Sequence, residues 1–181
     1  MTEIEVKLNR LVRELRLIDC PVIALSGGVL STFLATVAQK ILGTQVYAVT
    51  VMAENCPFNE CTQAKEKAKQ IGIEHFVLDI RNAIGSRALY QENPCAFCDE
   101  LQQKLLKRWA KEKGFRCILE GSCEAFCLSH GGRQFKEAVS RDFIRRPFAF
   151  AELTRDDIVA ISRGWGIMEA HTRFKQENIY Q

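Results

Sequence analysis

The sequence lacks long hydrophobic runs and an excess of either charge. No apolar run approaches the length of about 18 residues at which a membrane-spanning helix is predicted. The N-terminus, MTEIEVKLNRLVREL, is charged and amphipathic and has no apolar segment typical of a secretion signal. The 25 basic and 22 acidic residues give a net charge of +3, which does not by itself indicate a nucleic-acid partner. We therefore expect a cytoplasmic globular protein with no membrane partner.

Proline is also scarce, with 4 residues in 181, whereas cysteine is abundant, with 8. Eight cysteines would suit a small secreted disulfide scaffold, but this chain is long and its pattern is that of an α/β protein. In a cytosolic chain such thiols are more often buried, metal-binding or catalytic than bridged.

The hydrophobic pattern alternates between strands and helices. Short apolar or β-branched runs predict strands at residues 22–25, 46–51, 75–80 and 117–119, and a short fifth strand at 144–148. Helical spacing predicts helices at residues 1–18, 33–42, 59–71, 96–113 and 134–139, and a capping box at 154–157 opens a last helix. Such alternation indicates an α/β fold, a doubly wound and mainly parallel five-stranded sheet with helices on both faces. We expect one domain over residues 1–181, with a looser segment at 81–94 and a loosely specified tail at 168–181.

A glycine turn separates the first strand from the first crossover helix. Ser26, Gly27 and Gly28 follow the strand directly, and Ser31 and Thr32 add hydroxyl groups. Backbone amides and a helix N-terminus converge on an anion in this arrangement, and glycines allow a phosphate to approach the backbone. The turn is neither G-x-x-x-x-G-K-[ST] nor G-x-G-x-x-G.

A second turn, Glu120-Gly121-Ser122, follows the fourth strand. In a parallel sheet the two turns lie at the same edge, where ligands of such folds bind. The sequence therefore predicts an anion or nucleotide site between them.

The first turn, Ser26-Gly27-Gly28-Val29-Leu30-Ser31, resembles the PP-loop, S-G-G-x-D-S, of the ATP pyrophosphatase superfamily, which is adenine nucleotide alpha hydrolase-like and Rossmann-like. Over roughly residues 20–168 the chain also resembles the LarE-like sacrificial sulfur transferases. The segment 93–98 is similar to N-x-x-R-C-Y-x-C-K, and 120–122 is similar to D-G-T-N. The segment 145–154, with R-R-P-F and then E-L-T, is similar to R-S-P-L followed by G-L-T-K.

This resemblance implies an ATP site and a set of residues for it. The pyrophosphate would be held by the loop residues Ser26, Gly27, Gly28, Ser31 and Thr32. Backbone groups of the second strand, at Ala48 and Thr50, would face the adenine. Gly121 would lie near the ribose and α-phosphate, and Arg145 would act as a catalytic cation. The implied cofactors are ATP and Mg²⁺, and the implied reaction is adenylation of a carboxylate, with ATP giving AMP and pyrophosphate, followed by sulfur transfer to a nicotinate-derived nucleotide.

Two departures from the family pattern open an alternative. Leu30 occupies the position of the PP-loop aspartate and cannot coordinate a hard cation. The cysteine-bearing P-A-C-L-A-S-R segment of the branch has no counterpart in residues 168–181. A degenerate, non-hydrolysing nucleotide- or metal-binding partner protein is therefore the alternative, and a further subunit could supply missing parts.

The cysteines allow three interpretations. Cys95 and Cys98 begin a predicted helix, where thiolates are favoured, and could transfer sulfur as catalytic groups. Together with Cys123 and Cys127 they could hold zinc or an iron–sulfur cluster. The third interpretation is that the thiols are small buried hydrophobic groups. Among the histidines, we expect His75 and His171 to be structural or on the surface, and His130, in the Gly-containing segment at the ligand edge, is the candidate for a functional role.

Taken together, these patterns favour an enzyme that adenylates a small-molecule or nucleotide-like substrate for sulfur transfer. A tRNA thiolation enzyme uses a similar loop, although no separate RNA-binding module is visible. Expected partners are the substrate, a sulfur donor or complementing subunit, and a second copy of the chain in a homo-oligomer.

Overall fold

The computed structural model describes residues 2–52, 58–84, 94–123 and 143–167. The helix expected at residues 134–139 and the tail at 168–181 lie outside the described residues. No helix within the described ranges is both long and apolar enough to cross a bilayer.

Five strands form one sheet with the order β3-β2-β1-β4-β5, and every pairing is parallel. The strands are β1 (Pro21–Ala24), β2 (Tyr47–Met52), β3 (Glu74–Asp79), β4 (Cys117–Glu120) and β5 (Ile144–Arg145). The predicted parallel α/β sheet is confirmed. Because the order reverses at β1, the carboxyl ends of β1 and β4 flank the switch point where ligands of open parallel sheets bind.

Seven α-helices are described around the sheet. They are α1 (Glu3–Arg16), α2 (Val29–Leu42), α3 (Phe58–Ile71), α4 (Arg81–Ile84), α5 (Pro94–Glu112), α7 (Pro147–Phe150) and α8 (Arg155–Gly164). A 3₁₀ turn, η1 (Gly43–Gln45), joins α2 to β2.

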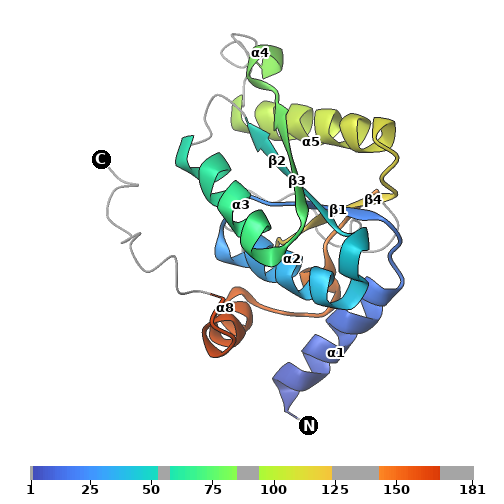
Figure 1. Cartoon of the computed structure of the whole chain (residues 1–181), viewed down its shortest axis with the longest axis vertical. Coiled ribbons are helices and arrows are strands. Elements are labelled where there is room, and N and C mark those ends of the chain that lie inside the picture. Colours follow the sequence, from blue (N-terminus) through green and yellow to red (C-terminus); the bar gives the residue numbers. More distant parts are fainter. Residues whose placement is uncertain (1, 53–57, 85–93, 124–142, 168–181) are drawn as a thin grey trace.

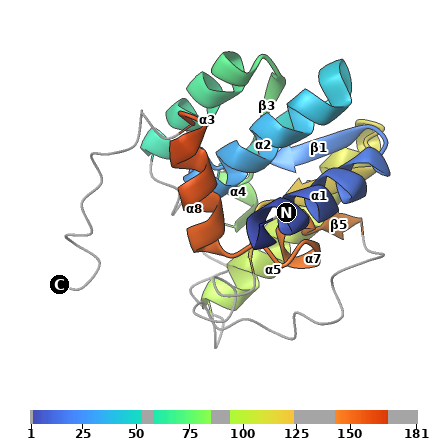
Figure 2. The same cartoon turned by 90° about the horizontal axis from the view of Figure 1, so that it is seen from below.

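The helices cover both faces of the sheet, as predicted. On one face α1, α2, α3, α7 and α8 share a core that includes the fully buried Leu15, Phe33 and Ile158. On the other face α5 packs through Leu106 and Ala110. Figures 1 and 2 show α2 and α3 on the side of the sheet opposite to α5. This arrangement follows from right-handed crossovers that run outward from β1 to β3 and then return to β4.

Capping boxes begin the first and last described helices. Thr2 and Glu5 exchange side-chain and backbone hydrogen bonds at the start of α1, and Thr154 and Asp157 do the same for α8. The boxes fix where each helix begins, so the apolar stripes of both helices face the core.

Two parts of the predicted element order are wrong. The fifth strand was expected over 144–148, but β5 ends at Arg145 and α7 begins at Pro147. Proline has no amide hydrogen to continue the sheet ladder and its fixed φ suits the first helical position. Fully buried Phe148 then packs against Phe33, with ring centroids 5.9 Å apart. The segment expected to be loose from residue 81 instead starts with the short helix α4.

Candidate functional site

The chain leaves the sheet at Leu25, whose amide donates a hydrogen bond to the carbonyl oxygen of Val49 at 2.9 Å. Gly27 then turns the backbone with a φ of +81°, a conformation that L side chains rarely adopt. Gly28 is the N-cap of α2 and provides no capping side chain, and the first turn of the helix contains no acidic residue. The helix thus begins with an uncapped, electropositive end at the carboxyl edge of β1.

Hydroxyl groups hold the turn, which we call the Ser26–Ser31 loop, in one shape. Ser31 Oγ donates to the carbonyl oxygen of Gly28 at 3.1 Å, accepts from the amide of Ser26 at 3.2 Å, and lies 3.1 Å from Ser26 Oγ. Thr32 Oγ1 donates to the Gly27 carbonyl oxygen at 3.4 Å. Both Ser31 and Thr32 are buried, whereas Ser26 is exposed. The buried hydroxyl groups of Ser31 and Thr32 therefore stabilise the backbone conformation of the loop through hydrogen bonds.

Within the described part of the fold, the first amides of α2 have no hydrogen-bond partner. The amides of Val29, Leu30 and Ser31 have no acceptor among the described residues. In an α-helix these first N–H groups have no preceding carbonyl to bond, and together with the helix dipole they make an anion-binding end. The geometry required for a phosphate is present, although the site-residue assignments themselves remain predictions.

Two glycines allow neighbouring elements to touch the loop. A Cβ on Gly27 would lie 3.0 Å from the backbone nitrogen of Ala64 in α3, and a Cβ on Gly121 would lie 3.1 Å from the amide nitrogen of Ser31. The loop is therefore enclosed between α3 and the end of β4. The turns at 26–28 and 120–122 do lie at one edge, as predicted.

The β2 residues assigned to the adenine lie in the core. Ala48, the second residue of the strand, is fully buried and is paired with Ile23 on one side and His75 on the other. Thr50 is 3% exposed, and its Oγ1 donates to the carbonyl oxygen of Leu25 at 2.6 Å and lies 2.7 Å from His75 Nε2. The side chains of both residues are occupied by packing or hydrogen bonds, which leaves only backbone groups for the predicted role.

His75 is half-buried on the same face of the sheet as Thr50. Burial, and to a lesser extent the charge of Lys65 on α3, lower the pKa of His75 below its usual value. The imidazole is therefore neutral at physiological pH. No pattern in the sequence indicates its contact with Thr50.

The two adjacent arginines after β4 point in different directions. Arg145, the predicted catalytic cation, lies in β5 with its guanidinium 3.6 Å from the carboxylate of Glu14 in α1. Arg146 instead lies 2.8 Å from Glu120, the last residue of β4, which precedes Gly121. Side chains of successive residues in an extended strand point to opposite sides of the sheet. The alternation along residues 144–146 therefore predicts that the side chains of Arg145 and Arg146 point in opposite directions. Arg146 and Glu120 therefore form a charged pair one residue before Gly121, which contacts the loop.

The described thiols do not form a metal centre. Cys20, Cys61, Cys117 and Cys123 are free, and no group of three or more metal-ligating side chains occurs in the described part of the chain. Cys123 is buried in the core, and burial raises the pKa of Cys117 to about 11, which keeps its thiol protonated. The side chains of Cys95 and Cys98, and all of Cys127, lie outside the described residues.

The described residues around the loop do not fit a magnesium ion. Mg²⁺ prefers carboxylate and other oxygen ligands, but position 30 carries a leucine whose side chain packs against the core. Glu120, the carboxylate at the end of β4, is paired with Arg146. We therefore derive no catalytic step through a metal.

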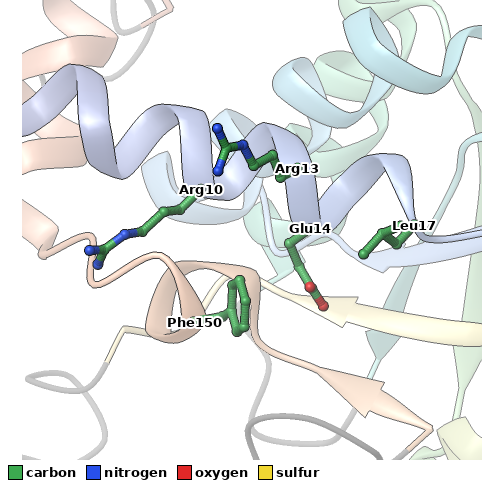
Figure 3. Close-up of a pocket in the computed structure, with 5 residues that line it drawn as sticks. All are labelled: Arg10, Arg13, Glu14, Leu17 and Phe150. Atoms are coloured by element: carbon green, nitrogen blue, oxygen red, sulfur yellow. The ribbon is translucent and has the colours of Figure 1, made fainter. Parts of the chain in front are cut away.

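A separate groove of about 370 Å³ lies between α1 and α7. Figure 3 shows its lining residues. Arg10, Arg13 and Glu14 come from α1, Leu17 follows the end of that helix, and Phe150 comes from α7. Two of these charges are already paired, Arg10 with Glu152 and Glu14 with Arg145. Since none of its lining residues belongs to the Ser26–Ser31 loop, the groove is not part of the site described above.

Several known proteins resemble this chain. The uncharacterized protein slr1717 of Synechocystis sp. is 31% identical over 119 residues, which cover 65% of this chain and 44% of the relative. The chain therefore spans less than half the length of that relative.

Three solved structures share the fold. An NH3-dependent NAD synthetase from Campylobacter jejuni in complex with the nitrate ion has a TM-score of 0.73 at 16% identity, covering 94% of this chain and 76% of its own. NMN synthetase from Francisella tularensis has a TM-score of 0.69 at 18% identity, covering 92% and 72%. The U34-tRNA thiolase NcsA from Methanococcus maripaludis, with its [4Fe-4S] cluster, has a TM-score of 0.66 at 14% identity, covering 96% and 67%. At such identities these structures show the fold alone.

The family model described as asparagine synthase matches residues 5–180, nearly the whole chain. This match confirms the PP-loop resemblance, while the LarE-like branch remains a prediction. Together with the uncapped loop at the switch point of a parallel sheet, it shows that the chain belongs to the asparagine synthase family of the PP-loop superfamily.

Proposed function

We propose that the chain is an ATP-binding PP-loop enzyme that adenylates a carboxylate or nucleotide-like substrate. The observation that carries the proposal is a set of amides, at residues 29–31, that have no acceptor among the described residues and lie in a loop held by the buried Ser31 hydroxyl at the carboxyl end of β1. Membership of a PP-loop family supports an adenine nucleotide as the anion.

The chemistry assigned to the loop is stabilisation of the leaving group. A carboxylate oxygen of the substrate attacks the α-phosphorus of ATP and forms a new P–O bond. The bond from the α-phosphorus to the bridging oxygen breaks, and pyrophosphate leaves with that electron pair. The amides of Val29, Leu30 and Ser31 hold its growing negative charge, and preorganised donors of this kind lower the barrier because they need no rearrangement.

Sulfur transfer is the proposed second step, as in the LarE-like branch. Cys95 and Cys98 are the candidate thiols, since they begin α5, where a helix dipole favours thiolate. The fold shared with a tRNA thiolase makes tRNA thiolation the alternative substrate class. A cytoplasmic location and a homo-oligomeric state belong to the same proposal.

A non-hydrolysing nucleotide-binding protein is the second candidate function. Leu30 favours it, because its partly buried side chain packs against the core at the position where the PP-loop pattern has a metal-binding aspartate. ATP binding without pyrophosphate release, in the presence of a nicotinate-derived nucleotide and other carboxylates, would establish this second function in place of the first.

The decisive experiment removes one loop amide and leaves the helix intact. Val29 is the first residue of α2 and follows Gly28, whose ψ is 164°. Proline is accepted at this position after an extended residue, so Val29→Pro deletes one N–H donor. We expect ATP affinity, measured by isothermal titration calorimetry, to fall roughly tenfold or more, because a hydrogen bond to a charged group contributes about 1.5–3 kcal/mol.

The matched control is Arg155→Pro at the start of α8. Arg155 also follows an N-cap with an extended ψ, 165° at Thr154, and lies far from the loop in the sequence. It should leave ATP affinity unchanged. If wild-type protein does not bind ATP, or if Val29→Pro binds it as tightly as wild type, the proposed site is wrong.

A further inference from the structure

The carbonyl group of Leu25 is the last sheet group before the Ser26–Ser31 loop. The β1–β2 register ends with Ala24 opposite Val49, and the Leu25 amide still bonds the Val49 carbonyl oxygen. The Leu25 carbonyl oxygen instead accepts the hydroxyl of Thr50 at 2.6 Å. A side chain of β2 therefore fixes the peptide group from which the loop departs.

The direction of the next hydrogen bond follows from proton counting. The Thr50 hydroxyl has one proton and donates it to Leu25, so it accepts a hydrogen bond from His75 Nε2 at 2.7 Å. The neutral imidazole thus carries its proton on Nε2. The result is a chain in which His75 donates to Thr50 and Thr50 donates to the Leu25 carbonyl.

The hydrogen-bond chain from His75 through Thr50 to Leu25 crosses three adjacent strands beneath α3. His75 belongs to β3, Thr50 to β2, and Leu25 follows β1, and these strands are neighbours in the sheet (Figure 1). Thr50 is buried and so cannot replace either contact with bulk water. The same helix that brings Lys65 near His75 also touches Gly27 through Ala64. The loop is therefore held from the strand side by the hydrogen-bond chain and from above by α3.

We propose that Thr50 and His75 are positioning residues of the Ser26–Ser31 loop, holding the Leu25–Ser26 peptide so that the loop amides converge on a phosphate. Neither residue contacts the ligand in this arrangement. The inference rests on the proposed nucleotide-binding function and extends it to residues in two other strands.

The test compares variants that lose or keep the hydroxyl. Thr50→Val removes it at nearly constant volume, and Thr50→Ser retains it. We expect ATP affinity, measured by titration calorimetry of the full chain, to fall about tenfold for Thr50→Val, the effect of one lost hydrogen bond, and to stay near wild type for Thr50→Ser. Thr36→Val is the matched control, because the Thr36 hydroxyl also donates to a backbone carbonyl, that of Thr32, but lies within α2.

A spectroscopic readout separates positioning from general stability. The nitrogen of Ser26 belongs to the same peptide group as the Leu25 carbonyl, so loss of the Thr50 bond shifts the Ser26 amide nitrogen signal in an NMR spectrum of the free protein. The signal should move in Thr50→Val and in His75→Phe, by a smaller amount in the latter, and should return in Thr50→Ser. His75→Phe also serves as the second variant if Thr50→Val does not fold.

The outcomes are distinct. Equal ATP affinities of wild type and a folded Thr50→Val or His75→Phe protein overturn the positioning role while leaving the proposed function intact. Equal losses for Thr50→Val and Thr50→Ser overturn it as well, because the hydroxyl would then be irrelevant. Absence of ATP binding by wild type overturns the proposed function and this inference with it.

Discussion

At the scale of single residues, Leu30 separates two properties that other PP-loops combine. Its amide belongs to the first turn of α2, the proposed anion-binding end, while its side chain packs against the core. Phosphate binding by backbone groups does not depend on the side chain, whereas cation binding does. The loop can therefore hold phosphate through N–H groups alone.

This separation predicts how the protein responds to magnesium. ATP affinity of the wild type, measured by calorimetry, should change little when Mg²⁺ is removed with a chelator. Leu30→Asp should introduce a Mg²⁺ requirement, since it restores a carboxylate at the loop, and Leu30→Asn is the neutral control of similar size. A strong loss of wild-type affinity on chelation would contradict the prediction and point to cation ligands elsewhere.

Gly27 has two features that oppose a side chain at this position. Gly27→Ala combines a φ of +81° with a Cβ only 3.0 Å from the backbone of α3. Gly72→Ala is a matched control, because Gly72 has a φ of +80° and nothing within 4 Å of its Cβ position. We expect urea denaturation to show a loss of about 1 kcal/mol for Gly72→Ala from the backbone alone. For Gly27→Ala we expect a loss larger by about 1–3 kcal/mol, which is the cost of forcing α3 to move. Equal losses of unfolding free energy in the two variants would show that α3 can move away from the added methyl group at little cost.

At the scale of elements, the stability of the fold depends on pH through His75, which lies in β3 near Lys65 of α3. Burial and Lys65 lower the pKa of His75 in the folded state, so protons bind more readily to the unfolded chain. The stability is unaffected well above the ordinary pKa of about 6.5 and declines as the pH falls from there toward the folded pKa. Urea denaturation between neutral and mildly acidic pH should show this decline in wild type and a weaker one in His75→Gln. Parallel pH profiles for the two proteins would contradict it.

The sequence predicted the elements that have a regular hydrophobic pattern. It did not predict the features that depend on packing between residues distant in the sequence. The parallel strands and the capping box at residues 154–157 were predicted because their patterns are local. The end of β5 was not, since Pro147 and the packing of Phe148 against Phe33 ended a run that is apolar enough for a strand. The contact of Thr50 with His75 had no sequence signal, because the two positions, 25 residues apart, meet only once the β2–β3 register is set.

At the scale of the whole molecule, the Ser26–Ser31 loop joins parts of the fold that are distant in sequence. It connects β1 to α2, touches α3 at Gly27, and touches the end of β4 through Gly121. Since a bound phosphate would contact this junction, the free energy of binding should add to the stability of the whole fold.

The size of this effect follows from mass action. ATP at a concentration 100 times its dissociation constant should stabilise the fold by about 2.7 kcal/mol. For a chain of this size that corresponds to a rise in melting temperature of roughly 5–10 °C, measured by differential scanning calorimetry. The rise should grow with the logarithm of the ATP concentration and should shrink in Val29→Pro, which lacks one loop amide, but not in Arg155→Pro. A rise of the same size in both proline variants would show that ATP binds elsewhere, because only one of them alters the loop.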